Sequence, residues 1–152
     1  MGIQNDTPNK KVLIFLAPGF EEITTIDLLV HLREIGLSVS LVSLAAGLVT
    51  SRHGLKVRPD YSLEQLSIKA PYQLIIVPGG QECTPTLVMD PRVRKLIEAT
   101  LHNDGFVAAT LTAEPLITQM NIPSLSGSSR FIPQRDMADK EFINVLVNLL
   151  SD

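Results

Sequence analysis

The sequence is poor in the groups that form cross-links and metal clusters. Cys83 is the only cysteine among 152 residues, which excludes an internal disulfide and any site built from several cysteines. The formal net charge is -3 and no basic stripe runs along the chain, so we expect no nucleic-acid partner. No apolar run reaches the roughly 18 residues of a membrane-spanning helix. We therefore expect no membrane association.

The start of the chain also lacks an export signal. Residues 1–10 form a polar leader without the apolar core of a signal peptide. Gly2 would suit N-myristoylation, but Asp6 stands where that signal requires Ser or Thr. Hydrophobic residues make up 45% of the chain, well above the level typical of disordered proteins. We expect a soluble, cytoplasmic protein in which residues 11–152 form one domain.

Short apolar runs alternate with helical patterns from residue 11 onward. Uninterrupted apolar runs are typical of strands that are covered on both faces, as in a parallel sheet. The predicted strands are Lys11–Leu16, Leu37–Leu44, Tyr72–Gly80 and Phe106–Ala109, and the predicted helices are Thr25–Ile35, Pro91–Asn103 and residues 138–150. This alternation predicts an α/β fold, a three-layer sandwich with a mainly parallel sheet.

Three other segments have weaker patterns. Gly54–Asp60 predicts a short edge strand that Pro59 ends. Tyr61–Leu66 predicts a single helical stretch. Residues 121–136 predict a loop, because Ser, Gly and Pro interrupt every periodicity there.

Ligands of open α/β sheets bind beyond the carboxyl ends of the strands, and we expect three turns to meet there. These turns are Pro18–Glu22, Pro78–Glu82 and Leu111–Pro115. Gly79 and Gly80 can offer backbone N–H groups to an oxyanion, or they only let the chain turn after a buried strand. The sequence leaves both interpretations open.

Two adjacent glutamates, Glu21 and Glu22, precede the first predicted helix. Carboxylates at this end of a helix are stabilised by its dipole, by about 0.3–1 kcal/mol. We expect one of them to cap the helix. The other is a candidate for an inward-facing carboxylate of the site.

Thr112 follows the fourth predicted strand, at a strand-to-helix corner of the kind that carries a nucleophile in hydrolases. A threonine hydroxyl needs a base, but His31, His53 and His102 all precede this turn, and none is expected at the site. Thr112 is otherwise a small polar residue in a tight turn. Cys83 is the one candidate for a reactive thiol, although a lone cysteine is more often an inert core residue.

The order and spacing of these segments resemble the DJ-1/ThiJ/PfpI superfamily, which is related to class I glutamine amidotransferase domains. The matching pieces are "KVLIFLAPGFEEI", "LREIG", "TSRHGLKVRPDYSLEQL", "PYQLIIVPGG", "VAATLTAEP" and "EFINVLVNLL". They cover most of Lys11 to Pro115 and the last helix. The resemblance implies a flavodoxin-like fold.

The resemblance also shows what the site has lost. The family carries a cysteine in a pattern such as A-x-C-x-x-P, and counting back from Pro115 places Thr112 there. The family's glutamate, in a pattern close to G-x-E-E-x-E, is replaced by Thr24 in "GFEEITT". A thiolate and the carboxyl that tunes it are thus both replaced. The residues of this vestigial pocket are Thr24, Thr112, Ala113, Glu21, Glu22, Gly79 and Gly80.

A third departure lies near the end of the chain. The family usually has a further strand and hairpin after the elbow helix, often with a histidine near the cysteine. Here the sequence predicts that the chain passes from Met120 through a Ser-rich loop to Met137 and directly into the last helix, and no histidine follows His102. We expect a domain shortened between about residues 120 and 137, without the hydrolase, glyoxalase or deglycase activities of the family.

These observations predict a non-catalytic protein that acts by binding, by regulation or in stress-related protection, without a cofactor or metal. The resemblance implies a homodimer through Glu21–Arg33, with Arg52 nearby, and leaves room for a small-molecule or protein partner. The alternative is an enzyme of altered chemistry that uses Thr112, Cys83 or Glu114 on a small carbonyl or amide substrate. A second alternative is a chaperone-like protein, if the shortened segment leaves apolar surface exposed.

Overall fold

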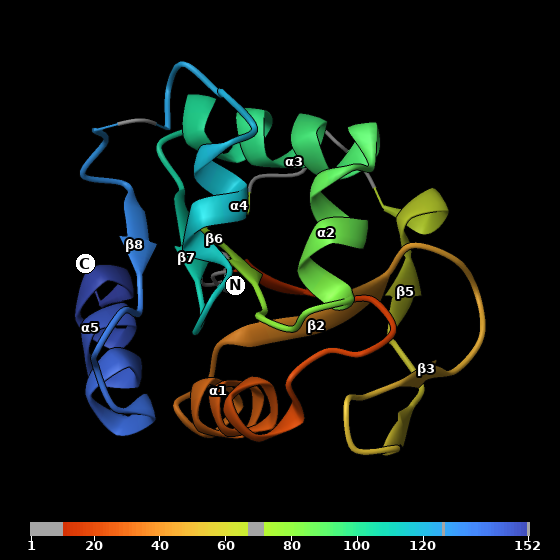
Figure 1. Cartoon of the computed structure of the whole chain (residues 1–152). Helices are drawn as coiled ribbons and strands as arrows, with labels where there is room; N and C mark the ends of the chain where they lie inside the picture. The colour runs from red at the N-terminus through yellow and green to blue at the C-terminus, as the bar shows by residue number, and fades with distance from the viewer. Residues whose placement is uncertain (1–10, 67–71, 126, 152) are drawn as a thin grey trace, which may run out of the picture.

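A parallel sheet forms the middle layer of the molecule (Figure 1). The computed structural model describes residues 11–66, 72–125 and 127–151. The six strands have the order β5-β2-β1-β6-β7-β8, and every pair is parallel. They are β1 (Lys11–Leu16), β2 (Ser38–Ser43), β5 (Tyr61–Ser62), β6 (Leu74–Val77), β7 (Phe106–Ala109) and β8 (Phe131–Pro133). The predicted α/β, flavodoxin-like fold is confirmed.

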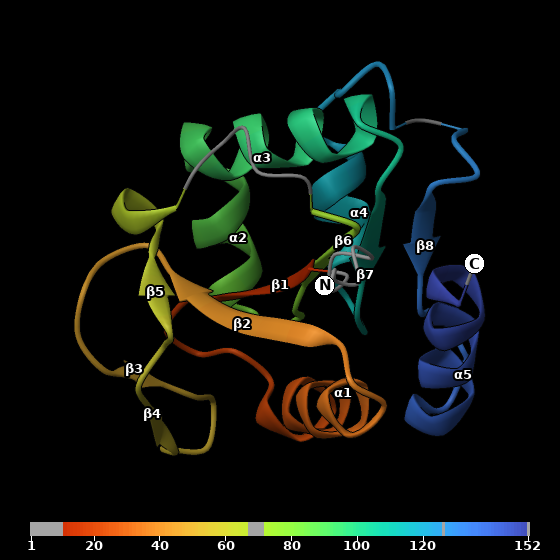
Figure 2. The ribbon, with the colours of Figure 1, turned by 180° about the vertical axis from the view of Figure 1, so that it is seen from behind.

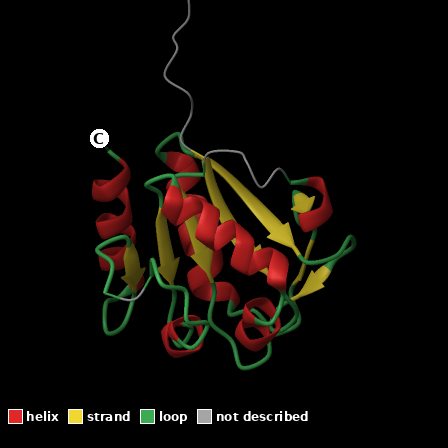
Figure 3. Cartoon of the chain, turned by 90° about the horizontal axis from the view of Figure 1, so that it is seen from above, coloured by secondary structure: helices red, strands yellow, loops and turns green. Residues whose placement is uncertain are grey.

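Helices cover both faces of the sheet, as Figures 1 and 2 show from opposite sides and Figure 3 from above. Helices α1 and α5 pack together on one face, whereas α2 contacts α3 and α4 on the other. The helices are α1 (Glu22–Glu34), α2 (Cys83–Val88), α3 (Pro91–His102), α4 (Glu114–Thr118) and α5 (Asp139–Leu150). Within the described residues, no helix is long and apolar enough to span a membrane.

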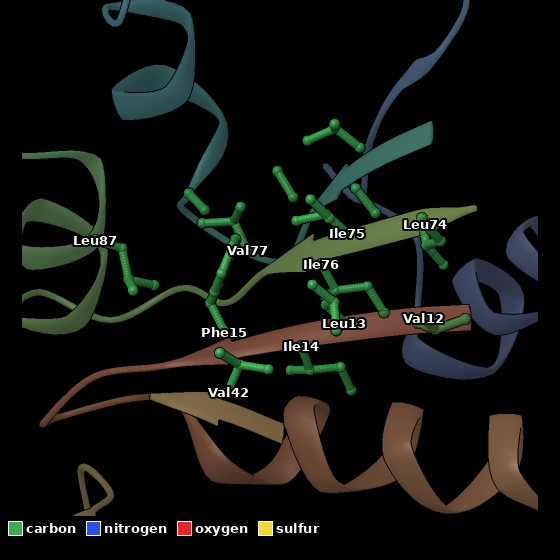
Figure 4. Close-up of a cluster of buried hydrophobic side chains, with 14 of the residues drawn as sticks. Val12, Leu13, Ile14, Phe15, Val42, Leu74, Ile75, Ile76, Val77 and Leu87 are labelled. Atoms are coloured by element: carbon green, nitrogen blue, oxygen red, sulfur yellow. The ribbon is translucent and has the colours of Figure 1, made fainter. Parts of the chain in front are cut away.

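The core lies where β1 and β6 run side by side at the centre of the sheet (Figure 4). Every residue from Val12 to Leu16 is at most 2% exposed, and Phe15 is fully buried. The four residues of β6 are also fully buried. Because helices cover both faces, these central strands are apolar at successive positions and do not alternate.

Local sequence determines where helices α1 and α3 begin. Glu21 caps α1, because its Oε1 accepts the N–H of Ile23 at 2.9 Å. Asp90 caps α3 in the same way through the N–H of Arg92, at 2.8 Å. Pro91 is the first residue of α3, where its missing N–H costs nothing.

The edge beyond β2 differs from the prediction. Instead of one edge strand at Gly54–Asp60, an antiparallel hairpin pairs β3 (Val49–Thr50) with β4 (Lys56–Val57). The helix predicted at Tyr61–Leu66 is wrong at its start, because Tyr61 pairs with Val42 of β2 and only Leu63–Gln65 forms a 3-10 turn. Two-residue strands are too short to show a periodicity in sequence.

The segment before α5 also differs from the prediction. Within the loop expected at residues 121–136, the chain forms β8 and therefore does not run directly into α5. β8 pairs with β7, and two further backbone bonds flank the pairing: Val107 N–H donates to Arg130 O at 2.9 Å, and Gln134 N–H donates to Ala109 O at 2.8 Å. β8 is a half-buried edge strand that includes a proline, and this is why its pattern is weak. Helix α2, which contains Pro85, was not predicted either.

Candidate functional site

The turns after β1, β6 and β7 meet at the carboxyl edge of the sheet, as parallel strands require. Glu21 N–H donates to Gly79 O at 3.2 Å, which joins the first turn to the second. Gly79 lies against the third turn, because a Cβ placed on it would stand 3.1 Å from Leu111 Cβ and 3.3 Å from Thr112 N. The three turns therefore form one continuous surface, as predicted.

Leu111, and not Thr112, stands at the tip of the elbow. Its φ of 51° lies in the left-handed region, which costs a residue with a side chain roughly 1–2 kcal/mol. In a nucleophile elbow the catalytic residue occupies this strained corner between strand and helix. The assignment of Thr112 to the nucleophile position is thus corrected by one residue. Counting from Pro115 gave Thr112, but the end of β7 at Ala109 sets the corner.

The elbow itself carries no nucleophile. The Leu111 side chain is 39% exposed and purely apolar. Thr112 is exposed, and its hydroxyl has no hydrogen-bond partner in the described part of the chain. Ala113 is fully buried and donates its N–H to Thr110 O at 3.0 Å, which closes the turn. Within the described residues, no base is therefore bonded to the Thr112 hydroxyl to activate it.

Gln134 holds the elbow in place from the end of β8. Its side chain is buried, and its Oε1 accepts the N–H of Leu111 at 3.0 Å. Its Nε2 donates to Met137 O at 3.0 Å and to Asp139 Oδ1 at 2.9 Å. One buried amide thus connects β7, β8 and the start of α5.

Thr24 stands where the family resemblance places a glutamate, and Asp139 lies beside it. Thr24 is only 4% exposed, and its hydroxyl lies 3.0 Å from both carboxylate oxygens of Asp139. Asp139 also accepts the bond from Gln134, so Thr24, Asp139, Gln134 and the Leu111 N–H form one continuous polar chain. A carboxylate is present here, but it comes from α5 and not from α1.

The turn that contains Gly79 and Gly80 offers fewer unbonded backbone N–H groups than the sequence predicts. Gly79 N–H donates to Thr110 Oγ1 at 3.0 Å and is therefore not available to a ligand. Gly80 has φ 137°, and a Cβ there would stand 2.6 Å from Gly19 O, so only glycine fits. Gly80 N–H and Thr112 N–H have no acceptor in residues 11–66, 72–125 and 127–151. Both groups are thus available to donate to an anion at this edge.

Glu22 binds the loop between β3 and β4. Its Oε2 accepts from the Ser51 hydroxyl and from His53 N–H at 2.9 Å, and its Oε1 lies 2.7 Å from His53 Nδ1. These bonds, the one from Ser51 first, lower the pKa of Glu22 to about 2. Of the two glutamates, Glu21 is thus the cap and Glu22 the inward one. His53, which sequence reasoning placed away from the site, lies at its rim.

Among the described residues, Glu21, Glu22 and His53 form a cluster of side chains that could hold a metal ion. Their ligand atoms lie within 4.8 Å of one another. Both oxygens of Glu22 already accept hydrogen bonds, however, and Glu21 caps the helix. The cluster stands at the amino end of α1, where the helix dipole disfavours a cation.

Comparison with known proteins places this arrangement in a family. A sequence model described as the DJ-1/PfpI family matches residues 10–140. The chain belongs to the DJ-1/PfpI family. Among solved structures, it is similar to Toxoplasma gondii DJ-1 in oxidized form, with a TM-score of 0.84 and 18% identity over 93% of this chain and 90% of that one. Drosophila melanogaster DJ-1beta gives a TM-score of 0.79 at 20% identity over 95% and 92%.

Curated relatives of this DJ-1/PfpI domain are longer. A Parkinson disease protein 7 homolog of Danio rerio is 30% identical over 66% of this chain and 53% of its own length. A deglycase of Thermococcus kodakarensis is 29% identical over 70% of this chain and 63% of its own length. The chain thus spans between about half and two thirds of the curated relatives that it matches.

Cys83 is not placed like the cysteine on which the family's chemistry depends. It is fully buried at the start of α2, and burial raises the pKa of its thiol to about 12. A thiol of this pKa is protonated at neutral pH and is a poor nucleophile. The structure therefore does not favour the proposal that Cys83 is a reactive thiol.

Sequence reasoning missed Gln134 and Asp139. Gln134 falls in the segment predicted as loop, and Asp139 has the pattern of an ordinary first-turn helix acid. They lie 110 and 115 positions after Thr24, and no local pattern links residues so far apart. Only the pairing of β8 with β7 brings them to the elbow.

Proposed function

We propose that this DJ-1/PfpI domain does not catalyse the family's reactions and acts by binding or regulation, including stress-related protection. The observation that carries the proposal is Leu111 at the tip of the elbow. An apolar side chain cannot form a covalent intermediate, and the strained backbone that would present a nucleophile presents a leucine instead.

Two further observations support the proposal. Thr24 binds Asp139, so the carboxylate near the elbow is already engaged by a hydroxyl and an amide. The only thiol of the chain, Cys83, is fully buried. The chain thus offers no exposed thiol, and the Thr112 hydroxyl beside the elbow tip has no hydrogen-bond partner among the described residues.

Turnover assays test this proposal directly. We expect the purified protein to show no activity above buffer on methylglyoxal or on glycated peptides. Leu111→Cys should create a thiol at the tip that a maleimide labels rapidly, whereas Cys83 in the wild-type protein should stay unlabelled under the same conditions. Wild-type turnover would contradict the proposal, and fast labelling of Cys83 would contradict the assignment of the core thiol.

A second candidate function is favoured by the unpaired donors of the edge. Gly80 N–H and Thr112 N–H could stabilise an oxyanion, and the exposed Thr112 hydroxyl lies beside them. An enzyme of altered chemistry on a small carbonyl or amide substrate would use these groups. In that case turnover should be present in the wild type and in Leu111→Ala and should be abolished in Thr112→Ala.

We also propose that the domain forms a homodimer through the exposed face of α1. Ile23 and Val30, seven positions apart and thus on one helix face, are 65% and 46% exposed. Leu55 is 47% exposed on the β3–β4 loop, which the Glu22 bonds hold against α1. Exposed apolar side chains on one helix face, with a further one on the adjoining loop, are of the kind that marks an interface.

Sedimentation of two charge variants tests the dimer. Val30→Arg should convert a dimer into a monomer, because it places a charge in the centre of the apolar face. Met89→Arg is the matched control, since Met89 is 81% exposed on the opposite side of the sheet, after α2. A wild-type protein that stays monomeric at all concentrations would overturn the proposal.

A further inference from the structure

A pocket of about 400 Å³ is lined by residues of α4, of the segment that follows α4 and of β8, and by Arg135. Its floor is apolar: Ile122 and Leu125 are each 2% exposed, and the half-buried Phe131 lines it as well. Its rim is polar and includes Glu114, Asn121 and Arg135. Small-molecule sites have this volume and this division between apolar floor and few polar groups.

At the rim, Arg135 and Glu114 form an ion pair that engages only part of the Arg135 guanidinium. Arg135 donates from Nε and Nη2 to the carboxylate of Glu114, at 3.1 and 2.8 Å. Nη1 has no acceptor in the described part of the chain. Since a guanidinium carries five N–H donors in a planar fork, its Nη1/Nη2 edge can receive a second carboxylate.

The backbone of the rim is strained at two positions. Arg135 has φ 51° and Asn121 has φ 54°, both in the left-handed region. Arg94 holds the backbone at Asn121 in place, because its guanidinium donates to the carbonyls of Met120 and Asn121. The side-chain amide of Asn121 has no partner among the described residues. Strained residues of this kind cluster at ligand sites, where the surrounding structure holds them.

We propose that this pocket binds a small organic carboxylate, with its apolar body on Ile122 and Phe131 and its carboxylate on the open edge of Arg135. A carboxylate fits better than an ammonium group, because Arg135 has unused donors whereas both oxygens of Glu114 are already engaged. Both groups of the ion pair are charged at neutral pH, because Arg135 lowers the pKa of Glu114 and Glu114 raises the pKa of Arg135. The proposal does not depend on the chemistry of the elbow.

Amide NMR shifts in three titrations test the ligand class: phenylacetate, its neutral analogue phenylacetamide, and the ammonium ligand phenethylamine. We expect saturable shifts at Ile122 and Phe131 with phenylacetate, at a Kd of about 1 mM for a ligand of this size. Phenylacetamide should bind more weakly. No shifts there with phenylacetate, or tighter binding of phenethylamine, would overturn the proposal.

Arginine variants test the contact itself. Arg135→Gln should weaken phenylacetate by about tenfold or more and leave phenylacetamide nearly unchanged, because only the charged ligand uses the fork. Arg58→Gln removes the same charge at an exposed site elsewhere and should change neither affinity. If Arg135→Gln fails to fold, Arg135→Lys replaces it and should bind phenylacetate more weakly than wild type. An unchanged affinity for phenylacetate in the folded variant would contradict the assignment.

Discussion

The carboxylate of Glu22 joins helix α1 to the loop of the β3–β4 hairpin. Its bonds to Ser51 and His53 favour the ionised form, so its pKa falls from the ordinary 4.5 to about 2. In the folded protein Glu22 therefore binds a proton less readily than in the unfolded chain. The stabilisation is fully present above the unfolded pKa of 4.5 and is lost as the pH falls towards 2.

This linkage predicts the pH dependence of Glu22→Gln. Its free energy of unfolding should lie below that of wild type at neutral pH, and the difference should shrink as the pH falls from about 5 to about 2. Urea unfolding by circular dichroism at a series of pH values measures it. Glu141→Gln, at an exposed first-turn position of α5, is the control and should show no such convergence. Parallel curves for wild type and Glu22→Gln would contradict the prediction.

At the scale of elements, one amide connects two strands and a helix. Gln134 follows β8, binds the N–H of Leu111 beyond β7 and reaches Asp139 at the start of α5. The edge strand β8 is short and half-buried, so these bonds contribute a large share of its attachment. The position of the elbow therefore depends on an element that the local pattern does not show.

We expect removal of the Gln134 amide to lower the free energy of unfolding. Gln134→Ala removes a buried amide and leaves the Leu111 N–H and the Met137 carbonyl without the partner they have in the wild type, which should cost about 1–3 kcal/mol in free energy of unfolding. Gln119→Ala is the control, because Gln119 is exposed at the end of α4 and its side chain makes no bond within the described residues. Chemical denaturation measures both, and equal effects of the two substitutions would refute the bridging role.

At the scale of the whole molecule, one core joins the two helical layers through the sheet. Phe15 is fully buried at the centre, where β1 lies between β2 and β6. Phe131, on the edge strand, is only half-buried. The cost of losing an aromatic ring should therefore depend on its distance from the central strands.

Two phenylalanine truncations test this dependence. Phe15→Ala should lower the free energy of unfolding by about 3–5 kcal/mol, because it leaves a cavity that close-packed neighbours cannot fill. Phe131→Ala should cost less, since solvent already reaches that ring. Both should unfold in a single transition with the m-value of wild type. A separate early transition in Phe131→Ala would show that β8 and α5 unfold as their own unit.

The sequence by itself determined the four central strands of the sheet and the place where their loops converge. A continuous apolar run such as Val12–Leu16 is removed from water only if both faces of the strand are covered, which favours a parallel α/β sheet. The carboxyl ends of parallel strands share an edge, so the glycine turn and the elbow had to meet. The capping role of Glu21 follows from equally local chemistry.

The tertiary structure alone decided which residues act at that edge. A left-handed φ at Leu111 is set by the end of β7, and counting from Pro115 therefore missed it by one position. Gln134 and Asp139 reach the elbow only because β8 pairs with β7, and the strand is too short to have a pattern. Burial patterns are local and can be read along the chain, whereas these contacts join residues far apart in sequence and exist only once the chain has folded.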